Sequence, residues 1–149
     1  MSSDTTTVSR HALAEGLLRA GDHPGAVRAL EQHLATQPRD ARAHHLLGLA
    51  TIGGVHPSEH QAAALDTALR HLHQAAALDC TQHCAEVAAL LVQDAALVRW
   101  HTQRVALDHL ELRLVARLSP AEAREITTLV PAPGTVWWEA LAALQATLH

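Results

Sequence analysis

The chain of 149 residues contains no phenylalanine, tyrosine, lysine or asparagine. Aromatic residues make up 2% of it, and the β-branched and aromatic residues that favour strands are scarce. Ala and Leu, the strongest helix formers, dominate the 48% of residues that are hydrophobic. The composition therefore argues against a strand-rich fold and predicts an all-α protein, whose length suits one domain.

The chain also lacks a basic stripe. Every strong base is Arg, and the net charge is -4 with the 13 histidines neutral. Proteins that bind nucleic acid usually carry clustered bases, so we expect no nucleic-acid partner. No apolar run is long enough to span a membrane, and residues 1–10 do not resemble a signal peptide, so we expect no membrane contact. Both cysteines are expected to be free thiols in a cytoplasmic protein.

Apolar residues at helical spacing, with capping residues and breakers between them, predict about seven or eight helices. The first spans residues 8–20 and buries Leu13, Leu17 and Ala20. The second lies between the capping Asp22 and Pro38, and the third between Asp40 and Gly53. The later predictions are a helix over 59–78 capped by Ser58 and Gln61, helices over 82–93 and 95–118 with a break near Asp94, and two helices that begin after Ser119 and Thr135.

The first two predicted helices form a hairpin that resembles a tetratricopeptide repeat. The matching positions are Ala14, Gly21, Ala26, Leu30 and Pro38. A second unit begins with Leu47-Gly48, takes an insertion over residues 53–60, resumes with Ala68, Leu72 and Ala75, and closes on Leu78-Asp79-Cys80. A third unit, from about His83, is degenerate.

The resemblance implies an α-α superhelix of antiparallel helix hairpins in a single domain. Residues 1–7 would be a disordered tail, 8–80 two hairpins, and 81–149 a degenerate repeat with C-terminal capping helices. Small residues let the helices approach closely, and stacked hairpins bury a shared core. An array without strong caps leaves apolar ends, so formation of a homo-oligomer is compatible with this arrangement.

The resemblance further implies a protein or peptide partner on the concave face made by the first helix of each hairpin. The chain positions on that face are His11, Glu15, Arg19, Arg42, His45 and Leu49. Trp138, about 100° from the apolar stripe of the last helix, is a further candidate contact because exposed Trp is enriched at interfaces. The carboxylate clamp of chaperone-binding members needs Lys and Asn, so we do not expect that specificity here.

Two groups of residues suggest metal chemistry. His56-Pro57-Ser58-Glu59-His60 has the spacing of an inverted zinc-peptidase motif, but Pro57 and Ser58 place it at a helix start, where the helical i, i+4 geometry is broken. The alternative metal site consists of His71, His73, Cys80, His83 and Cys84, which are potential zinc ligands without a short zinc-finger spacing. Buried thiols and surface imidazoles explain the same residues without a metal.

No nucleophile elbow, phosphate-binding Gly loop or calcium loop occurs in the sequence. We therefore predict a non-enzymatic protein without a cofactor. The favoured function is protein–protein interaction, as an adaptor or a small chaperone-like binder of a peptide or helix. Transition-metal binding through the His/Cys group is the alternative.

Overall fold

The computed structural model describes residues 3–79, 83–97 and 113–147. These residues form seven α-helices and two short 3-10 helices, and they contain no strand. The predicted all-α class is therefore confirmed. In chain order the elements are α1 (Ser3–Arg19), α2 (His23–Thr36), α3 (Ala41–Ile52), η1 (Pro57–Glu59), α4 (Ala62–Leu78), α5 (Cys84–Leu97), η2 (Arg113–Arg117), α7 (Pro120–Leu129) and α8 (Val136–Gln145).

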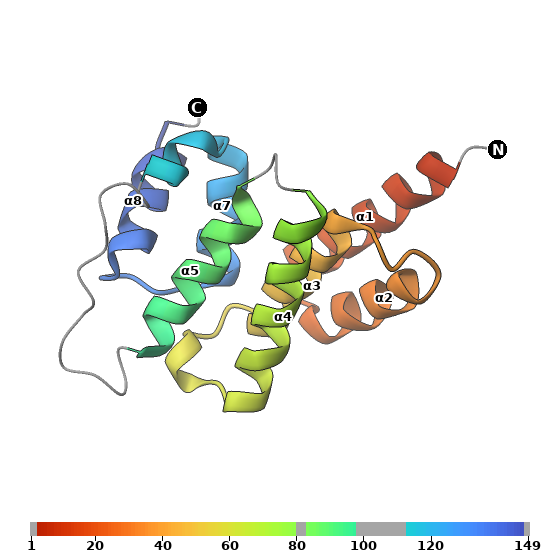
Figure 1. Ribbon diagram of the computed structural model, residues 1–149, viewed down its shortest axis with the longest axis horizontal. Coiled ribbons are helices and arrows are strands. Elements are labelled where there is room, and N and C mark those ends of the chain that lie inside the picture. Colours follow the sequence, from red (N-terminus) through yellow and green to blue (C-terminus); the bar gives the residue numbers. More distant parts are fainter. Residues whose placement is uncertain (1–2, 80–82, 98–112, 148–149) are drawn as a thin grey trace.

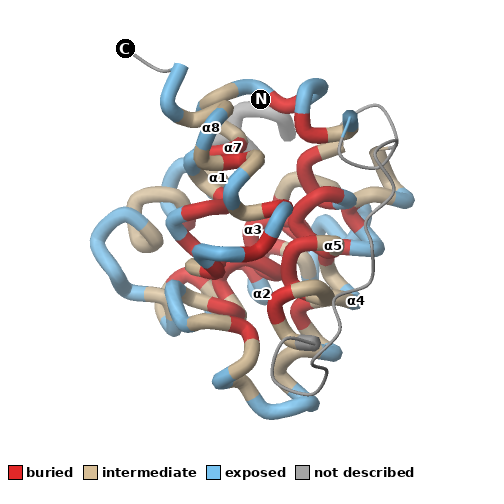
Figure 2. The backbone as a smooth tube through the Cα atoms, turned by 90° about the vertical axis from the view of Figure 1, so that its left-hand side faces the viewer, coloured by how far each residue is buried: buried red, intermediate tan, exposed pale blue. Residues whose placement is uncertain are grey.

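Each helix from α1 to α4 packs against the next helix in the chain, and α7 packs against α8. Figure 1 shows α1 and α2 at one end, α3 and α4 in the middle, and α5, α7 and α8 at the other end. Helix α3 is buried along most of its length, and Figure 2 shows that buried backbone is concentrated in α3, α5 and the adjoining turns. The shared core therefore lies on either side of α3.

Local capping explains where four of the helices begin. The side chain of Asp22 accepts a hydrogen bond from the Gly25 N–H, and that of Asp40 accepts one from the Ala43 N–H. Ser119 and Glu122 form a reciprocal capping box, and Thr135 caps α8. Each cap pairs a backbone N–H that a helix start leaves without an intrahelical partner.

Small residues bring neighbouring helices together, as the repeat pattern predicts. Ala14, Ala26 and Ala68 are completely buried. A Cβ atom on Gly48 would lie 2.7 Å from Cγ of Leu72 and 3.0 Å from the carbonyl oxygen of Ala68, so α3 and α4 are in direct contact there. Leu30, Leu72 and Ala75 also lie in the core.

The first helix differs from the prediction at both its start and its buried face. Helix α1 begins at Ser3, so residues 3–7 are helical rather than a disordered tail. No Gly or Pro precedes Gly16, and the polar residues before Val8 are compatible with a first turn. The predicted stripe is only partly correct: Leu17 packs against the core, but Leu13 is 48% exposed and Ala20 is exposed, and Ala14 is the fully buried residue.

The predicted start of the fourth helix is wrong by three residues. Pro57 begins the short helix η1, and Nδ1 of His56 accepts a hydrogen bond from the Ser58 N–H at 3.1 Å. Ser58 therefore belongs to η1 and does not cap α4, which begins at Ala62. Helix α4 ends at Leu78, as predicted.

The predicted break near Asp94 is also wrong, because α5 continues to Leu97. Leu91, Val92 and Ala95 are fully buried around Asp94, and their burial outweighs the modest helix preference of Asp. Of the helix predicted over 95–118, residues 95–97 belong to α5 and 113–117 form η2. Residues 98–112 lie outside the described part of the chain.

No helix within the described ranges is long and apolar enough to cross a membrane.

Candidate functional site

An ion-pair network occupies the first-helix face that was predicted to bind a partner. The guanidinium of Arg42 on α3 contacts Glu125 on α7 through two bonds, Nη1–Oε1 at 2.8 Å and Nη2–Oε2 at 2.7 Å. Nη2 also lies 3.0 Å from Oε1 of Glu15 on α1. This bidentate geometry is the strong form of an Arg–carboxylate pair. The network therefore joins three helices.

The buried imidazole of His45 lies beside the same carboxylate. Its Nε2 is 3.4 Å from Oε1 of Glu125, which is long for a hydrogen bond, and neither ring nitrogen has another partner among the described residues. Burial alone would raise the pKa of Glu125, but the neighbouring His45 and Arg42 outweigh it and hold that pKa at about 2. Glu125 is therefore ionised at neutral pH.

The predicted partner-binding residues on this face consequently have different environments. Glu15, Arg42 and His45 lie together in the network. Leu49 is completely buried in the core and is not accessible to a partner. His11 contacts Asp40, and Arg19 at the end of α1 is exposed. Helix α7 of the same chain thus covers the middle of the face.

Trp138 is half-buried at the opposite end of the molecule. Its Nε1–H donates a hydrogen bond to the carbonyl oxygen of Thr127 at 3.3 Å. The indole therefore connects α8 to α7. This contact gives Trp138 a structural role, in which its side chain covers the end of the helix bundle.

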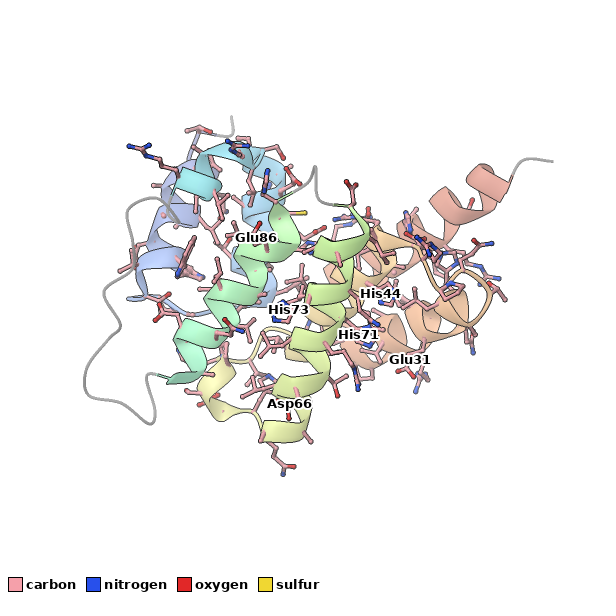
Figure 3. All side chains as sticks on the ribbon, viewed as in Figure 1. Glu31, His44, Asp66, His71, His73 and Glu86 are labelled. Carbon is pink, nitrogen blue, oxygen red and sulfur yellow. The ribbon has the colours of Figure 1, made fainter. Side chains whose placement is uncertain are left out.

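The residues of the alternative metal site do not converge in the described structure. His71 stacks on His44, while His73 on the same helix is exposed, and Figure 3 shows the two on different sides of α4. His83 lies 3.5 Å from Glu86. Cys84 is buried, and burial together with nearby Glu122 raises its pKa to about 12, so the metal-binding thiolate is disfavoured. Cys80 lies outside the described residues.

The peptidase-like motif over residues 56–60 is likewise used for local structure. Oγ of Ser58 lies 2.8 Å from Nδ1 of His56, and Nε2 of His60 is 2.8 Å from the carbonyl oxygen of Ile52. His60 must donate its N–H to that carbonyl. The two imidazoles are therefore engaged with separate partners.

A groove of about 1,030 Å³ lies between α2 and α4, with α3 beneath it. We call it the α2–α4 groove. Its floor is apolar and buried. Its walls, formed by α2 and α4, carry exposed and partly exposed residues. Lining residues include Leu47 and Ala50 on the floor, Val27, Glu31 and Leu34 on α2, and Ala63, Ala64, Thr67 and Arg70 on α4.

Two stacked imidazoles form part of the same groove (Figure 3), with ring centroids 5.2 Å apart. Nε2 of His44 lies 2.8 Å from the carbonyl oxygen of Pro38, so it carries the proton and donates. In that tautomer Nδ1 of His44 is the acceptor, and the Nδ1–H of His71 donates to it at 3.0 Å. Burial, His44 and Arg70 lower the pKa of His71, which favours the neutral form of the His71 imidazole.

A second depression of about 630 Å³ lies between α1 and α7. We call it the α1–α7 cleft. Glu15 and Arg19, both predicted partner contacts, line one side, and Arg124 and Glu125 line the other. This cleft is the part of the first-helix face that α7 leaves open.

The sequence prediction missed the α2–α4 groove because it placed the partner on the face made by the first helix of each hairpin. The sequence signal that could have revealed the groove was the width of the apolar stripe on α2. In the structure Val27 and Leu34 on this stripe are only partly buried. The insertion over residues 53–60 was recognised, and Gly53 at its start is one of the residues that line the groove.

Comparison with known protein families identifies one match. Residues 8–50 match the family model of the tetratricopeptide repeat. The matched segment contains most of α1, all of α2 and most of α3. No curated protein and no solved structure matches the chain significantly.

Proposed function

We propose that this tetratricopeptide-like helical repeat protein is a protein–protein interaction module that binds a segment of a partner in the α2–α4 groove. The observation that carries this proposal is the groove itself, an opening of about 1,030 Å³ with a buried apolar floor. Ligand sites are typically concave and mostly apolar, with a few polar groups that fix orientation. The groove has this composition.

The groove suits an amphipathic helix laid between α2 and α4. The apolar face of such a helix would cover Leu47 and Ala50, as in other helix-in-groove complexes. Glu31 and Arg70 carry opposite charges on opposite walls. A basic residue of the partner near Glu31 and an acidic one near Arg70 would therefore set its direction.

The adaptor form of this function is supported by the two separate openings. The α2–α4 groove is formed by α2, α3 and α4, whereas the α1–α7 cleft is formed by different helices and is lined by charged residues. An adaptor holds two partner segments at once. We assign the apolar segment to the groove and propose Glu15 and Arg19 as contacts for a charged segment in the cleft.

Site-specific photo-cross-linking in an extract of the native host tests the groove. A photoreactive residue at Ala63, which lines the groove and is exposed, is compared with one at Ala77, which is exposed on the same helix outside the groove. The proposal expects a discrete cross-linked partner peptide from position 63 and not from position 77. Equal cross-linking from both positions, or none from position 63, would contradict it.

A further inference from the structure

Three potential metal ligands meet where α1, α2 and the start of α3 come together. Nε2 of His11 lies 2.7 Å from Oδ2 of Asp40, and Nε2 of His33 lies 2.6 Å from the same oxygen. All three ligand atoms are within 4.8 Å of one another. Although the chain has 13 histidines, no other His, Cys or carboxylate group meets this criterion among the described residues.

The surroundings hold these three side chains in place. The His33 side chain is 4% exposed. The other carboxylate oxygen of Asp40, Oδ1, accepts a hydrogen bond from the Ala43 N–H and so caps α3. The rings of His11 and His33 are nearly perpendicular, at 84°, with centroids 5.7 Å apart. Both rings thus direct Nε2 at one carboxylate oxygen, and each residue comes from a different structural segment.

We propose that His11, His33 and Asp40 form a binding site for a divalent transition-metal ion, for which zinc is the best-suited metal. Zinc binds imidazole nitrogen and carboxylate oxygen at about 2.0–2.1 Å, which places tetrahedral ligand atoms about 3.3 Å apart. Each Nε2 atom therefore needs to move roughly 0.6 Å away from Oδ2 of Asp40, relative to its hydrogen-bonded distance. His11 and Asp40 are 17% and 11% exposed, so a water molecule can complete the coordination.

Protonation of the three groups is compatible with metal binding. Without an ion, each imidazole donates its Nε2–H to Asp40. With an ion, the neutral Nδ1–H tautomer leaves the Nε2 lone pair for the metal. Burial raises the pKa of Asp40, but hydrogen bonds from His33, His11 and Ala43 outweigh it, so the pKa lies below its ordinary value and the carboxylate is ionised.

This site is distinct from the His/Cys group considered from the sequence. It is formed by α1, α2 and the N-cap of α3 and contains no thiol, whereas Cys84 belongs to α5. Cobalt, which commonly replaces zinc, distinguishes the two sites, because thiolate ligands produce a charge-transfer band that His and Asp do not. The metal alone is therefore a sufficient probe.

The test is titration of metal-free protein with Zn²⁺ by calorimetry and with Co²⁺ by absorption. We expect one ion per chain and a cobalt spectrum without a thiolate band. Asp40→Asn, in which Asn still caps α3, and His11→Ala should each weaken zinc binding at least about 10-fold. His73→Ala, at an exposed histidine outside the site, should leave the affinity unchanged.

Thermal unfolding provides a second readout. Zinc at about 100 times its wild-type dissociation constant should raise the Tm of the wild type by roughly 5–10 °C and that of Asp40→Asn by about half as much or less. The proposal is overturned if the wild type binds no zinc, if Asp40→Asn and His11→Ala bind it as tightly as the wild type, or if a thiolate band appears. Loss of binding in Cys84→Ser with an unchanged fold would also overturn it.

Discussion

Arg42 and Glu125 are separated by 83 residues in the chain, yet their side chains form a bidentate ion pair with distances of 2.7 and 2.8 Å. The pair fastens α7 to α3, on the face where tetratricopeptide-like arrays are expected to bind partners. The C-terminal part of the chain therefore covers the middle of that face. The larger opening is the α2–α4 groove, on the second-helix side.

Glu125→Gln should destabilise the protein by about 1–3 kcal/mol, because the partly buried Arg42 loses its bidentate partner and keeps only the single contact with Glu15. Urea unfolding measures the change. Glu86→Gln is the matched control, since Glu86 is 50% exposed and should give a change within about 0.5 kcal/mol. Equal free energies of unfolding for Glu125→Gln and the wild type would show that the pair does not contribute to stability.

The contribution of Glu125 should depend on pH in the acid range. Its pKa is about 2 in the folded protein and 4.5 in the reference state, so the unfolded chain binds the proton more readily. Its stabilising contribution is therefore complete above about pH 5 and is lost as the pH falls toward 2. The difference in unfolding free energy between wild type and Glu125→Gln should shrink between pH 5 and pH 3. A difference that stays constant would contradict the assigned pKa.

Two glycines in helices should respond oppositely to substitution by alanine. At Gly48 the new Cβ would clash with Leu72 and the Ala68 carbonyl, and we expect a loss of about 1–3 kcal/mol. At Gly16 the nearest atom is 4.0 Å away, and the higher helix propensity of Ala should add roughly 0.5–1 kcal/mol. Urea unfolding of both variants provides the test. Stabilisation of Gly48→Ala would mean that α3 and α4 are not in close contact.

Cys84 should be nearly inert toward thiol reagents in the folded protein. Its pKa rises from 9.0 to about 12, which lowers the thiolate fraction about 1,000-fold, and its side chain is buried. In Cys80→Ser, where Cys84 is the single thiol, the alkylation rate at pH 8 should fall by at least that factor relative to the protein in denaturing urea. A reduction of less than tenfold would contradict this environment.

Local chemistry made much of the fold predictable. Asp22, Asp40, Ser119 and Thr135 cap the helices that they were predicted to cap, since a cap depends only on a few adjacent residues. The error near Ser58 has a local cause, whereas the error near Asp94 has a tertiary one. Pro57 and His56 recruit Ser58 into η1, and burial on both sides of Asp94 extends α5 through it.

The sites were less predictable because their residues meet only after folding. His11, His33 and Asp40 have no recognisable metal-binding spacing, and Arg42 contacts Glu125 across most of the chain. The α2–α4 groove depends on how far apart α2 and α4 lie above α3. Helical periodicity identified the apolar residues on each helix but carried no information on that separation.

The central claim is that the α2–α4 groove binds a partner segment, and calorimetry with the peptide recovered by cross-linking tests it most directly. Ala63→Trp fills the groove, whereas Ala77→Trp adds the same side chain elsewhere on α4. We predict that Ala63→Trp weakens binding at least about 10-fold and that Ala77→Trp binds like the wild type. Equal affinities for the wild type and both variants would contradict the claim.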